Sequence, residues 1–256
     1  HVMAMTATAT TSTTKRIADI LGMSNPVIVS ETPDKLNVRY GVKEEGTIKR
    51  VFEPLALKLR TQRKKMQRVI IYCRQCEECS FIYQFFHSYL KAEVTEPIGV
   101  PNLARFRLVD MYTSVTQKEV QSTIIKSFCS AEAPLRIVIC TIAFGMGLDC
   151  DDVKQVIHWG PSADLESYMQ ETGRAGRNGQ MSSALLYLRK DAVRTTSKDM
   201  KDYCSNATKC RRAVLNSYFG YDATPATSGC ACCDICAVSC KCDSCNCNDF
   251  PVELNL

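Results

Sequence analysis

The sequence predicts an α/β protein, with a doubly wound parallel sheet flanked by helices and a small cysteine-rich module after it. Short β-rich runs alternate with helical patterns over residues 15–195, and this alternation is typical of parallel α/β domains. The runs are continuously apolar, as expected for strands covered on both faces. From about residue 196 the alternation stops, and a Pro/Thr/Ser/Gly-rich linker leads to eight cysteines within residues 229–247.

Six strands and five helices are expected in the α/β part. The helix at 117–128 has a clear apolar face, formed by Val120, Ile124, Ile125 and Phe128. The expected strands are 26–30, 68–73, 107–112, 136–141, 154–159 and 184–188. The other expected helices are 15–21, 53–66, 76–91 and 164–175, and a further helix is expected after residue 196.

Composition limits the class of protein. The chain has 256 residues and a net charge of +5, which permits nucleic-acid binding without requiring it. The basic run at 58–68 is typical of a solvated helix end, with phosphate contact as the alternative.

No stretch approaches the roughly 18 apolar residues of a membrane span. The start has no features of a secretory signal, and its initial His suggests a fragment. Sixteen cysteines in such a chain favour metal binding over disulfides.

Two glycine-rich segments have the chemistry of a phosphate site. "TIAFGMGLD" (141–149) and "QETGRAGRNGQ" (170–180) each follow a predicted strand, so both are expected at the carboxyl ends of the strands. Gly145 and Gly147 allow the backbone to approach phosphates closely. Arg174 and Arg177 are three residues apart and should project from nearly the same face, where guanidinium groups suit phosphate oxygens. The alternative is a surface helix end with two solvated arginines.

The run "RIVICTIAFGMGLDCDDVKQVIHWGPSADLESYMQETGRAGRNG" (136–179) resembles motifs V and VI of the RecQ family of superfamily-two helicases. "AMTATAT" (4–10) resembles motif III, "VIIYCRQ" (69–75) resembles motif IV, and "NVRYGV" (37–42) resembles the entry into the second lobe. The resemblance implies the end of a first RecA-like lobe at 1–14 and a second RecA-like lobe at 15–195. A zinc-binding helical hairpin would follow at 196–238, and a cysteine-rich tail at 239–256.

The resemblance also implies an ATP-dependent helicase that moves 3′ to 5′ on single-stranded DNA and unwinds duplex DNA. Its partners would be DNA and, only with the missing first lobe, ATP and Mg²⁺, with a nuclear location and no membrane. In the ATP site, Arg177 would be the arginine finger, Arg174 its neighbour and Gln170 a supporting group, with Asp149 and Gly147 also near the nucleotide. The DNA backbone would contact Thr141, Gly145, Gly147 and Arg74. Thr6 and Thr8 would couple the ATP state to lobe closure.

The sequence departs from the family pattern in several places. "MYTSVT" (111–116) stands where a Tyr-His-Ala-Gly-Leu stretch is usual, and Arg74-Gln75-Cys76 replaces the usual continuation of motif IV. Neither a GxxxxGK[ST] phosphate loop nor an Asp-Glu-x-His motif occurs in the 256 residues. We therefore expect no ATPase activity from this chain alone. Two alternatives stay open: a non-catalytic nucleic-acid-binding protein, and an RNA helicase of the same superfamily, against which the Met of "AFGMG" and the zinc module count.

Three groups of cysteines bear on metal binding. The resemblance implies a structural zinc ion held by four thiolates, namely Cys210, Cys230, Cys233 and Cys236, with Cys204 and Cys232 as bystanders. Cys73, Cys76 and Cys79 have the same spacing but are expected to be small apolar side chains of a strand and helix. The last four, Cys240, Cys242, Cys245 and Cys247, suit either a thiol-rich tail, which is favoured, or a second zinc site. His87 and His158 are expected to be structural.

Overall fold

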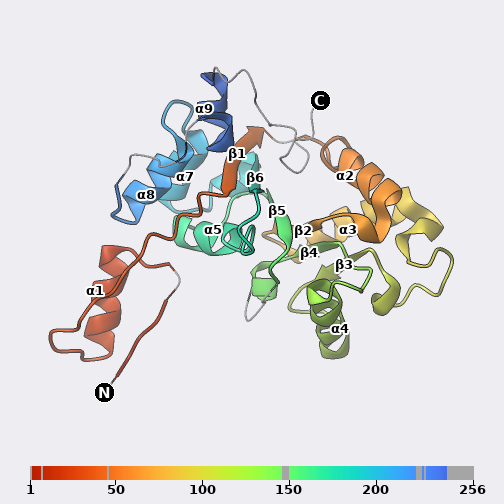
Figure 1. Cartoon of the computed structure of the whole chain (residues 1–256), viewed down its shortest axis with the longest axis horizontal. Helices are drawn as coiled ribbons and strands as arrows, with labels where there is room; N and C mark the ends of the chain where they lie inside the picture. The colour runs from red at the N-terminus through yellow and green to blue at the C-terminus, as the bar shows by residue number, and fades with distance from the viewer. Residues whose placement is uncertain are drawn as a thin grey trace.

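A six-stranded parallel sheet forms the centre of the protein, in the order β1-β6-β5-β2-β4-β3 (Figure 1). The computed structural model describes residues 2–6, 8–44, 46–145, 150–222, 227 and 229–240. Every pair of neighbouring strands is parallel, which agrees with the continuous apolar runs. The strands are β1 (Val38–Glu44), β2 (Arg68–Cys73), β3 (Val109–Tyr112), β4 (Ile137–Cys140), β5 (Val153–Trp159) and β6 (Ser182–Leu188).

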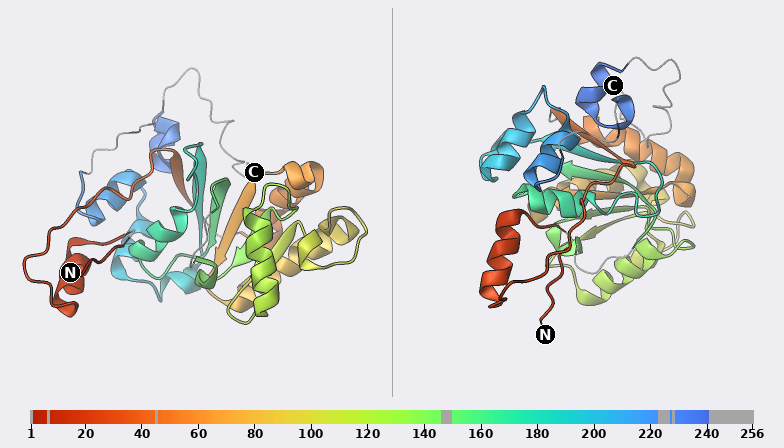
Figure 2. Two further views of the ribbon diagram at one scale, coloured as in Figure 1. Left: turned by 60° about the horizontal axis from the view of Figure 1, so that its bottom comes forward. Right: turned by 60° about the vertical axis from the view of Figure 1, so that its left-hand side comes forward.

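Helices cover both faces of this sheet and create two apolar cores. Along β2, Val69 and Ile71 belong to one core and Ile70 to the other, because successive side chains point to opposite faces. Helices α2 (Ile48–Gln62) and α3 (Cys76–Leu90) pack on the first face. On the second face lie α4 (Lys118–Cys129), α5 (Leu165–Thr172), α7 (Lys198–Ser205), α8 (Arg211–Tyr218) and α9 (Asp234–Val238). Figure 2 shows the sheet between these layers.

The helix starts follow from local capping. Asp164 caps α5 by accepting a 2.7 Å hydrogen bond from Ser167 N, and Thr47 caps α2 by accepting one of 3.2 Å from Arg50 N. Helix α3 begins with a capping box, in which the Glu78 carboxylate accepts from Gln75 N at 3.1 Å. Such caps satisfy backbone N–H groups that have no partner within the helix.

At the start of the chain, one expected element is wrong and another has a different start. The apolar run 26–30 forms no strand, and Val27 and Val29 are 91% and 90% exposed. The edge strand is instead β1, which the sequence pattern missed and which pairs with β6 along its whole length. The expected helix 15–21 is α1 (Thr11–Ile20), because the Thr10 side chain accepts from Thr13 N and starts the helix earlier. No residue of α1 is buried.

The cysteine-rich module packs directly on the sheet. Met200 of α7 and Leu215 of α8 lie in the same core as Val38 of β1. The Cys232 carbonyl accepts a 3.2 Å hydrogen bond from Tyr40 N, so it lies beside the outer edge of β1. Among the described residues, none of the helices combines the length and apolar character that crossing a membrane requires.

Candidate functional site

The "GRAGR" turn lies at the amino ends of the strands. Helix α5 runs back along the sheet after β5, so the turn that follows it reaches the start of β5, where Gly176 N donates to Val153 O at 3.0 Å. The expectation that this segment lies at the carboxyl ends is therefore wrong. Gly176 has φ +63°, and a Cβ there would overlap the Asn37 side-chain amide. Only glycine tolerates both this positive φ and the close approach of the Asn37 amide.

Two residues that the sequence reasoning did not single out hold this turn. The Lys35 ammonium donates to Gly173 O at 2.5 Å and to Ala175 O at 3.2 Å. The Asn37 amide donates to Gly176 O and Gln180 O, both at 2.8 Å. Asn37 O also accepts from Ser182 N at 2.8 Å, which joins the turn to the first residue of β6. The signal in the sequence was the "NVRYGV" stretch, of which Asn37 is the first residue and which Lys35 precedes by two positions.

The two arginines of the turn do not share a face. Helix α5 ends at Thr172, so the three-residue spacing that aligns side chains on a helix does not apply. Arg174 is only 6% exposed and lies near Tyr72, where its charge opposes the rise in the Tyr72 pKa that burial causes. Arg177 is exposed, and its charge adds to the effect of burial in lowering the pKa of Lys35. Gln170 is also exposed, on α5.

A buried polar network fixes α5 against β5. Glu171 Oε2 is 2.8 Å from His158 Nε2 and accepts a 2.6 Å hydrogen bond from Ser162 Oγ. The His158 ring stacks on Tyr72, with centroids 5.3 Å apart. His158 is thus a buried structural residue, as the sequence suggested. Since Glu171 lies three residues before Arg174, the network also sets where the arginine turn begins.

We expect Glu171→Gln to lower the free energy of unfolding by about 1–3 kcal/mol, because buried partners of a carboxylate would be left poorly matched. Urea unfolding followed by circular dichroism measures this change. Gln170→Ala is the matched control, since Gln170 is on the same helix but exposed. Equal stability of the two variants would contradict a stabilising role for the network.

Three of the other predicted residues, Thr141, Arg74 and Gly145, follow the carboxyl ends of strands β4 and β2. Thr141 directly follows β4 and is almost fully buried. Arg74 follows β2, and its guanidinium donates to Ala192 O and Thr195 Oγ1, both at 3.0 Å. Gly145 ends a short 3-10 helix at Ile142–Gly145. Gly147 and Asp149 lie outside the described residues.

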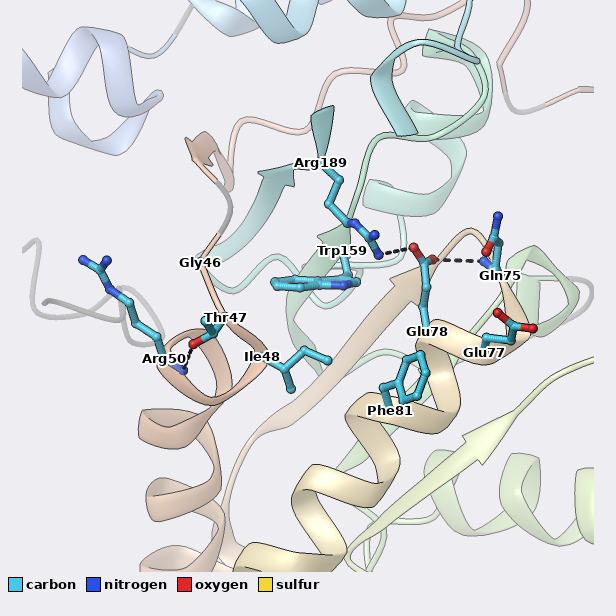
Figure 3. Close-up of a pocket in the computed structure, with 10 residues that line it drawn as sticks. All are labelled: Gly46, Thr47, Ile48, Arg50, Gln75, Glu77, Glu78, Phe81, Trp159 and Arg189. Carbon is cyan, nitrogen blue, oxygen red and sulfur yellow. Dashed lines mark hydrogen bonds and ion pairs between the residues drawn. The ribbon is translucent and has the colours of Figure 1, made fainter. Parts of the chain in front are cut away.

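A pocket of about 760 Å³ opens at the same edge, between the first turns of α2 and α3 (Figure 3). Trp159 lies at its base, and the adjacent Arg189 guanidinium forms an ion pair with Glu78 (Figure 3). Phe81 is 57% exposed at the rim. Sequence reasoning did not identify this pocket, because its residues come from four separate segments. The remaining lining residues are Gly46, Thr47, Ile48, Arg50, Gln75 and Glu77.

Thr6 and Thr8 bond mainly to each other in the described structure. Thr6 Oγ1 donates to Thr8 O at 3.1 Å, and Thr8 N donates to Thr6 Oγ1 at 3.3 Å. Both line a cavity of about 930 Å³ between the start of the chain, α1 and residues 26–33. Their predicted coupling role stays a prediction.

Four sulfur atoms gather in the cysteine-rich module within 4.8 Å of one another, those of Cys210, Cys232, Cys233 and Cys236. The Cys210 sulfur is 3.5 Å from that of Cys232 and 4.0 Å from that of Cys233. A tetrahedral zinc ion with Zn–S bonds of about 2.3 Å needs sulfur atoms about 3.8 Å apart. The donor set and its spacing therefore fit zinc.

This cluster differs from the predicted ligand set at one position, since it contains Cys232 in place of Cys230. The 3-10 turn Gly229–Ala231 is closed by Cys232 N donating to Gly229 O at 3.1 Å, and it turns Cys232 inward beside β1. Cys230 stays half-buried on the turn itself. Hydrogen bonding by the Cys232 thiol lowers the pKa of Cys233 to about 4. One thiolate is thus favoured even before a metal ion binds.

The other C-x₂-C-x₂-C cysteines lie in the core. Cys73 and Cys79 are buried, and Cys76 is half-buried at the first turn of α3. Burial raises the pKa of Cys73 well above its usual value, as expected for an apolar thiol environment.

Arg212 connects the cysteine cluster with the arginine turn. Its side chain is fully buried and forms an ion pair with Asp34. It also donates to Lys35 O at 2.9 Å and Val38 O at 2.6 Å, and it lies over the Tyr40 ring at 5.3 Å. Segment 34–40 is therefore held by α8 of the module, while Lys35 and Asn37 hold the turn.

Residues 52–179 match the helicase conserved C-terminal domain, and residues 178–237 match the RecQ zinc-binding domain. ATP-dependent DNA helicase Q-like 2 of Arabidopsis thaliana is 28% identical over 252 residues, covering 93% of this chain and 33% of that protein. RecQ-like DNA helicase BLM of Xenopus laevis is 31% identical over 241 residues, which cover 86% of this chain and 16% of that protein. The chain thus spans a third or less of these relatives.

The solved structure of S. cerevisiae Dbp5 bound to RNA and ADP BeF3 shares the fold, with a TM-score of 0.56 at 16% identity. The match covers 84% of this chain and 48% of that one. At this identity the likeness concerns the fold alone. The parallel sheet with helices on both faces is accordingly RecA-like.

Proposed function

Because the chain belongs to the RecQ family of helicases, we propose that it forms the second motor lobe and the zinc-binding module of an ATP-dependent DNA helicase. The observation that carries the proposal is the exposed Arg177 on a turn fixed by Lys35 and Asn37. A guanidinium on a turn with a fixed backbone at a lobe surface can reach the γ-phosphate of ATP bound on a partner lobe. Arginine fingers of this kind raise NTPase rates by about 10³–10⁵.

The two edges of the sheet would have separate tasks. The amino-end edge, with Arg177, would face the nucleotide. The carboxyl-end edge, with Arg74, Thr141 and the Trp159 pocket, would face single-stranded DNA. Contacts to phosphates are independent of sequence, which suits an enzyme that moves along a strand. Closure of the lobe on the nucleotide, followed by release, would then produce 3′ to 5′ steps.

Zinc would be structural in this arrangement. Cys210, Cys232, Cys233 and Cys236 would hold the ion, which would brace α8 and, through Arg212, the segment before β1. The chain contains neither a phosphate-loop motif nor an Asp-Glu-x-His motif, so we propose that it does not hydrolyse ATP alone. A nuclear location and a role in replication, recombination or repair are part of the proposal and rest on family membership.

A chimaera tests the proposal, with the first lobe of the Arabidopsis relative joined ahead of this chain. We expect DNA-stimulated ATP hydrolysis and unwinding of a DNA duplex with a 3′ single-stranded tail, whereas the chain alone should show background hydrolysis. DNA binding by both proteins without ATPase activity would favour the non-catalytic binding protein instead. Preferential unwinding of an RNA duplex would contradict the assignment to DNA, and unwinding only from a 5′ tail would contradict the polarity.

A further inference from the structure

Two cysteines outside the zinc cluster lie together where α4 ends and β5 begins. Cys129 is the last residue of α4 and is exposed, whereas Cys150 lies three residues before β5 and is buried. The two side chains share a hydrogen bond. The Cys150 sulfur is also 3.3 Å from the carbonyl oxygen of Phe128, which belongs to the peptide group that joins Phe128 to Cys129. The two thiols are therefore neighbours, although all of β4 lies between them in the sequence.

A buried arginine holds the two segments that contain these thiols. The Arg68 side chain is 4% exposed, forms an ion pair with Asp152 and donates to Ser130 O. Ser130 follows Cys129, and Asp152 is the residue before β5. Groups that the fold holds side by side react with each other far more readily than the same groups free in solution.

The two thiols differ in their access to solvent and in their readiness to ionise. Cys129 is exposed, so an oxidant in solution can reach it directly. Burial and the neighbouring Cys129 raise the pKa of Cys150 to about 12, and a neutral thiol is a poor nucleophile. The Cys150 thiol nevertheless has an acceptor for its proton, because Asp152 Oδ1 lies 3.4 Å from its sulfur. Cys129 should therefore react first, and Cys150 should react with the product.

We propose that Cys129 and Cys150 form a reversible disulfide when the chain meets a hydroperoxide. The Cys129 thiolate attacks one oxygen of hydrogen peroxide, the O–O bond breaks, and the hydroxide that leaves takes up the thiol proton as water. The product is a sulfenic acid on Cys129. The Cys150 sulfur then attacks the Cys129 sulfur, and its proton passes through Asp152 to the hydroxide released as the S–O bond breaks. Two thiols and one peroxide thus become one disulfide and two water molecules.

The disulfide would close a loop from residue 129 to residue 150 that contains all of β4 and Thr141. Oxidation would therefore restrain a segment to which the proposed function assigns a DNA contact. That consequence rests on the proposed function. The disulfide itself does not, because its formation is measured without ATP or DNA.

Peptide mapping of the intact chain tests the proposal. The reduced chain, in buffer that contains zinc, is treated with a small molar excess of hydrogen peroxide, alkylated and digested with trypsin. We expect peptide 127–136 to be linked to peptide 137–154, and the link to disappear after treatment with dithiothreitol. Because peptide 137–154 also contains Cys140, fragmentation by tandem mass spectrometry must place the link at Cys150. Oxidation of the cysteines around the zinc site does not affect this readout, because they lie in other peptides.

Three variants check the assignment. Cys129→Ser changes an exposed side chain and should abolish the link, as should Cys150→Ala. Cys76→Ser is the matched control, since it removes a half-buried thiol on α3, and it should leave the yield of linked peptide unchanged.

Three results would overturn the proposal. The first is a link from peptide 127–136 to a cysteine other than Cys150, including a link that persists in Cys150→Ala. The second is oxidation of Cys129 to the sulfinic acid without a link, because Cys150 would then fail to capture the sulfenic acid. The third is an unmodified Cys129 in the wild-type chain. The wild-type map alone decides between these results, so the test does not depend on the folding of a variant.

Discussion

Arg177→Ala is expected to lower kcat for ATP hydrolysis by about 10³-fold or more in the chimaera with a first lobe, which corresponds to a loss of about 4 kcal/mol of transition-state stabilisation. The reason is that the charge on the γ-phosphate grows in the transition state and a fixed guanidinium stabilises it there. The KM for ATP should change much less. Steady-state kinetics with saturating single-stranded DNA measures both constants.

Two further variants separate the finger role from a structural one. Arg177→Lys keeps the charge but loses the bidentate geometry, so its activity should lie between those of wild type and Arg177→Ala. Arg174→Ala removes a side chain that is 6% exposed, so its defect should include a lower thermal midpoint. A kcat for Arg177→Ala within threefold of wild type would contradict the arginine-finger assignment.

Arg212→Met is expected to destabilise the chain by about 3–5 kcal/mol, because it leaves the carboxylate of Asp34 buried without its partner. The side chains of Arg212 and Asp34 are 0% and 5% exposed. The carbonyls of Lys35 and Val38 would lose a donor as well. Chemical unfolding monitored by circular dichroism gives the free energy directly.

The controls for Arg212 use a second ion pair and a double variant. Arg60→Met breaks an exposed pair with Glu93 and should change stability little, because solvent screens such pairs. Arg212→Met combined with Asp34→Leu should recover part of the lost free energy of unfolding, since no unpaired charge remains buried. Hydrogen exchange should also rise in residues 173–180 of Arg212→Met before it rises in β2 and β4. An unchanged exchange rate there would contradict the link between module and turn.

Most of the central sheet was predictable from the sequence. The runs 68–73, 136–141, 154–159 and 184–188 all contain strands, because each is long, apolar and buried on both sides. The strand at the β6 side of the sheet, the edge strand β1, was not predictable in the same way. The run 26–30 has the residues of a strand but no pairing partner, whereas β1 has a mixed composition and pairs fully with β6.

The candidate site, too, was predictable only in part from the sequence. The glycine and arginine pattern of 170–180 identified the segment and its family, since those residue types are chemically specific. Its position at the amino ends of the strands could not be inferred, because it depends on the path of α5 back along the sheet. Lys35 and Arg212 could not be inferred either. Each acts through contacts with residues more than a hundred positions away in the sequence.

By itself, the sequence determined the α/β class, the parallel sheet, the RecQ resemblance and a group of cysteines suited to zinc, because periodicity, residue chemistry and short spacings express these directly. Only the tertiary structure decided which edge of the sheet each motif occupies, which arginine of "GRAGR" is exposed and that Cys232 rather than Cys230 joins the cluster. These depend on long-range packing. A turn that moves a side chain by a few ångströms changes its partners without changing the local pattern that encodes the turn.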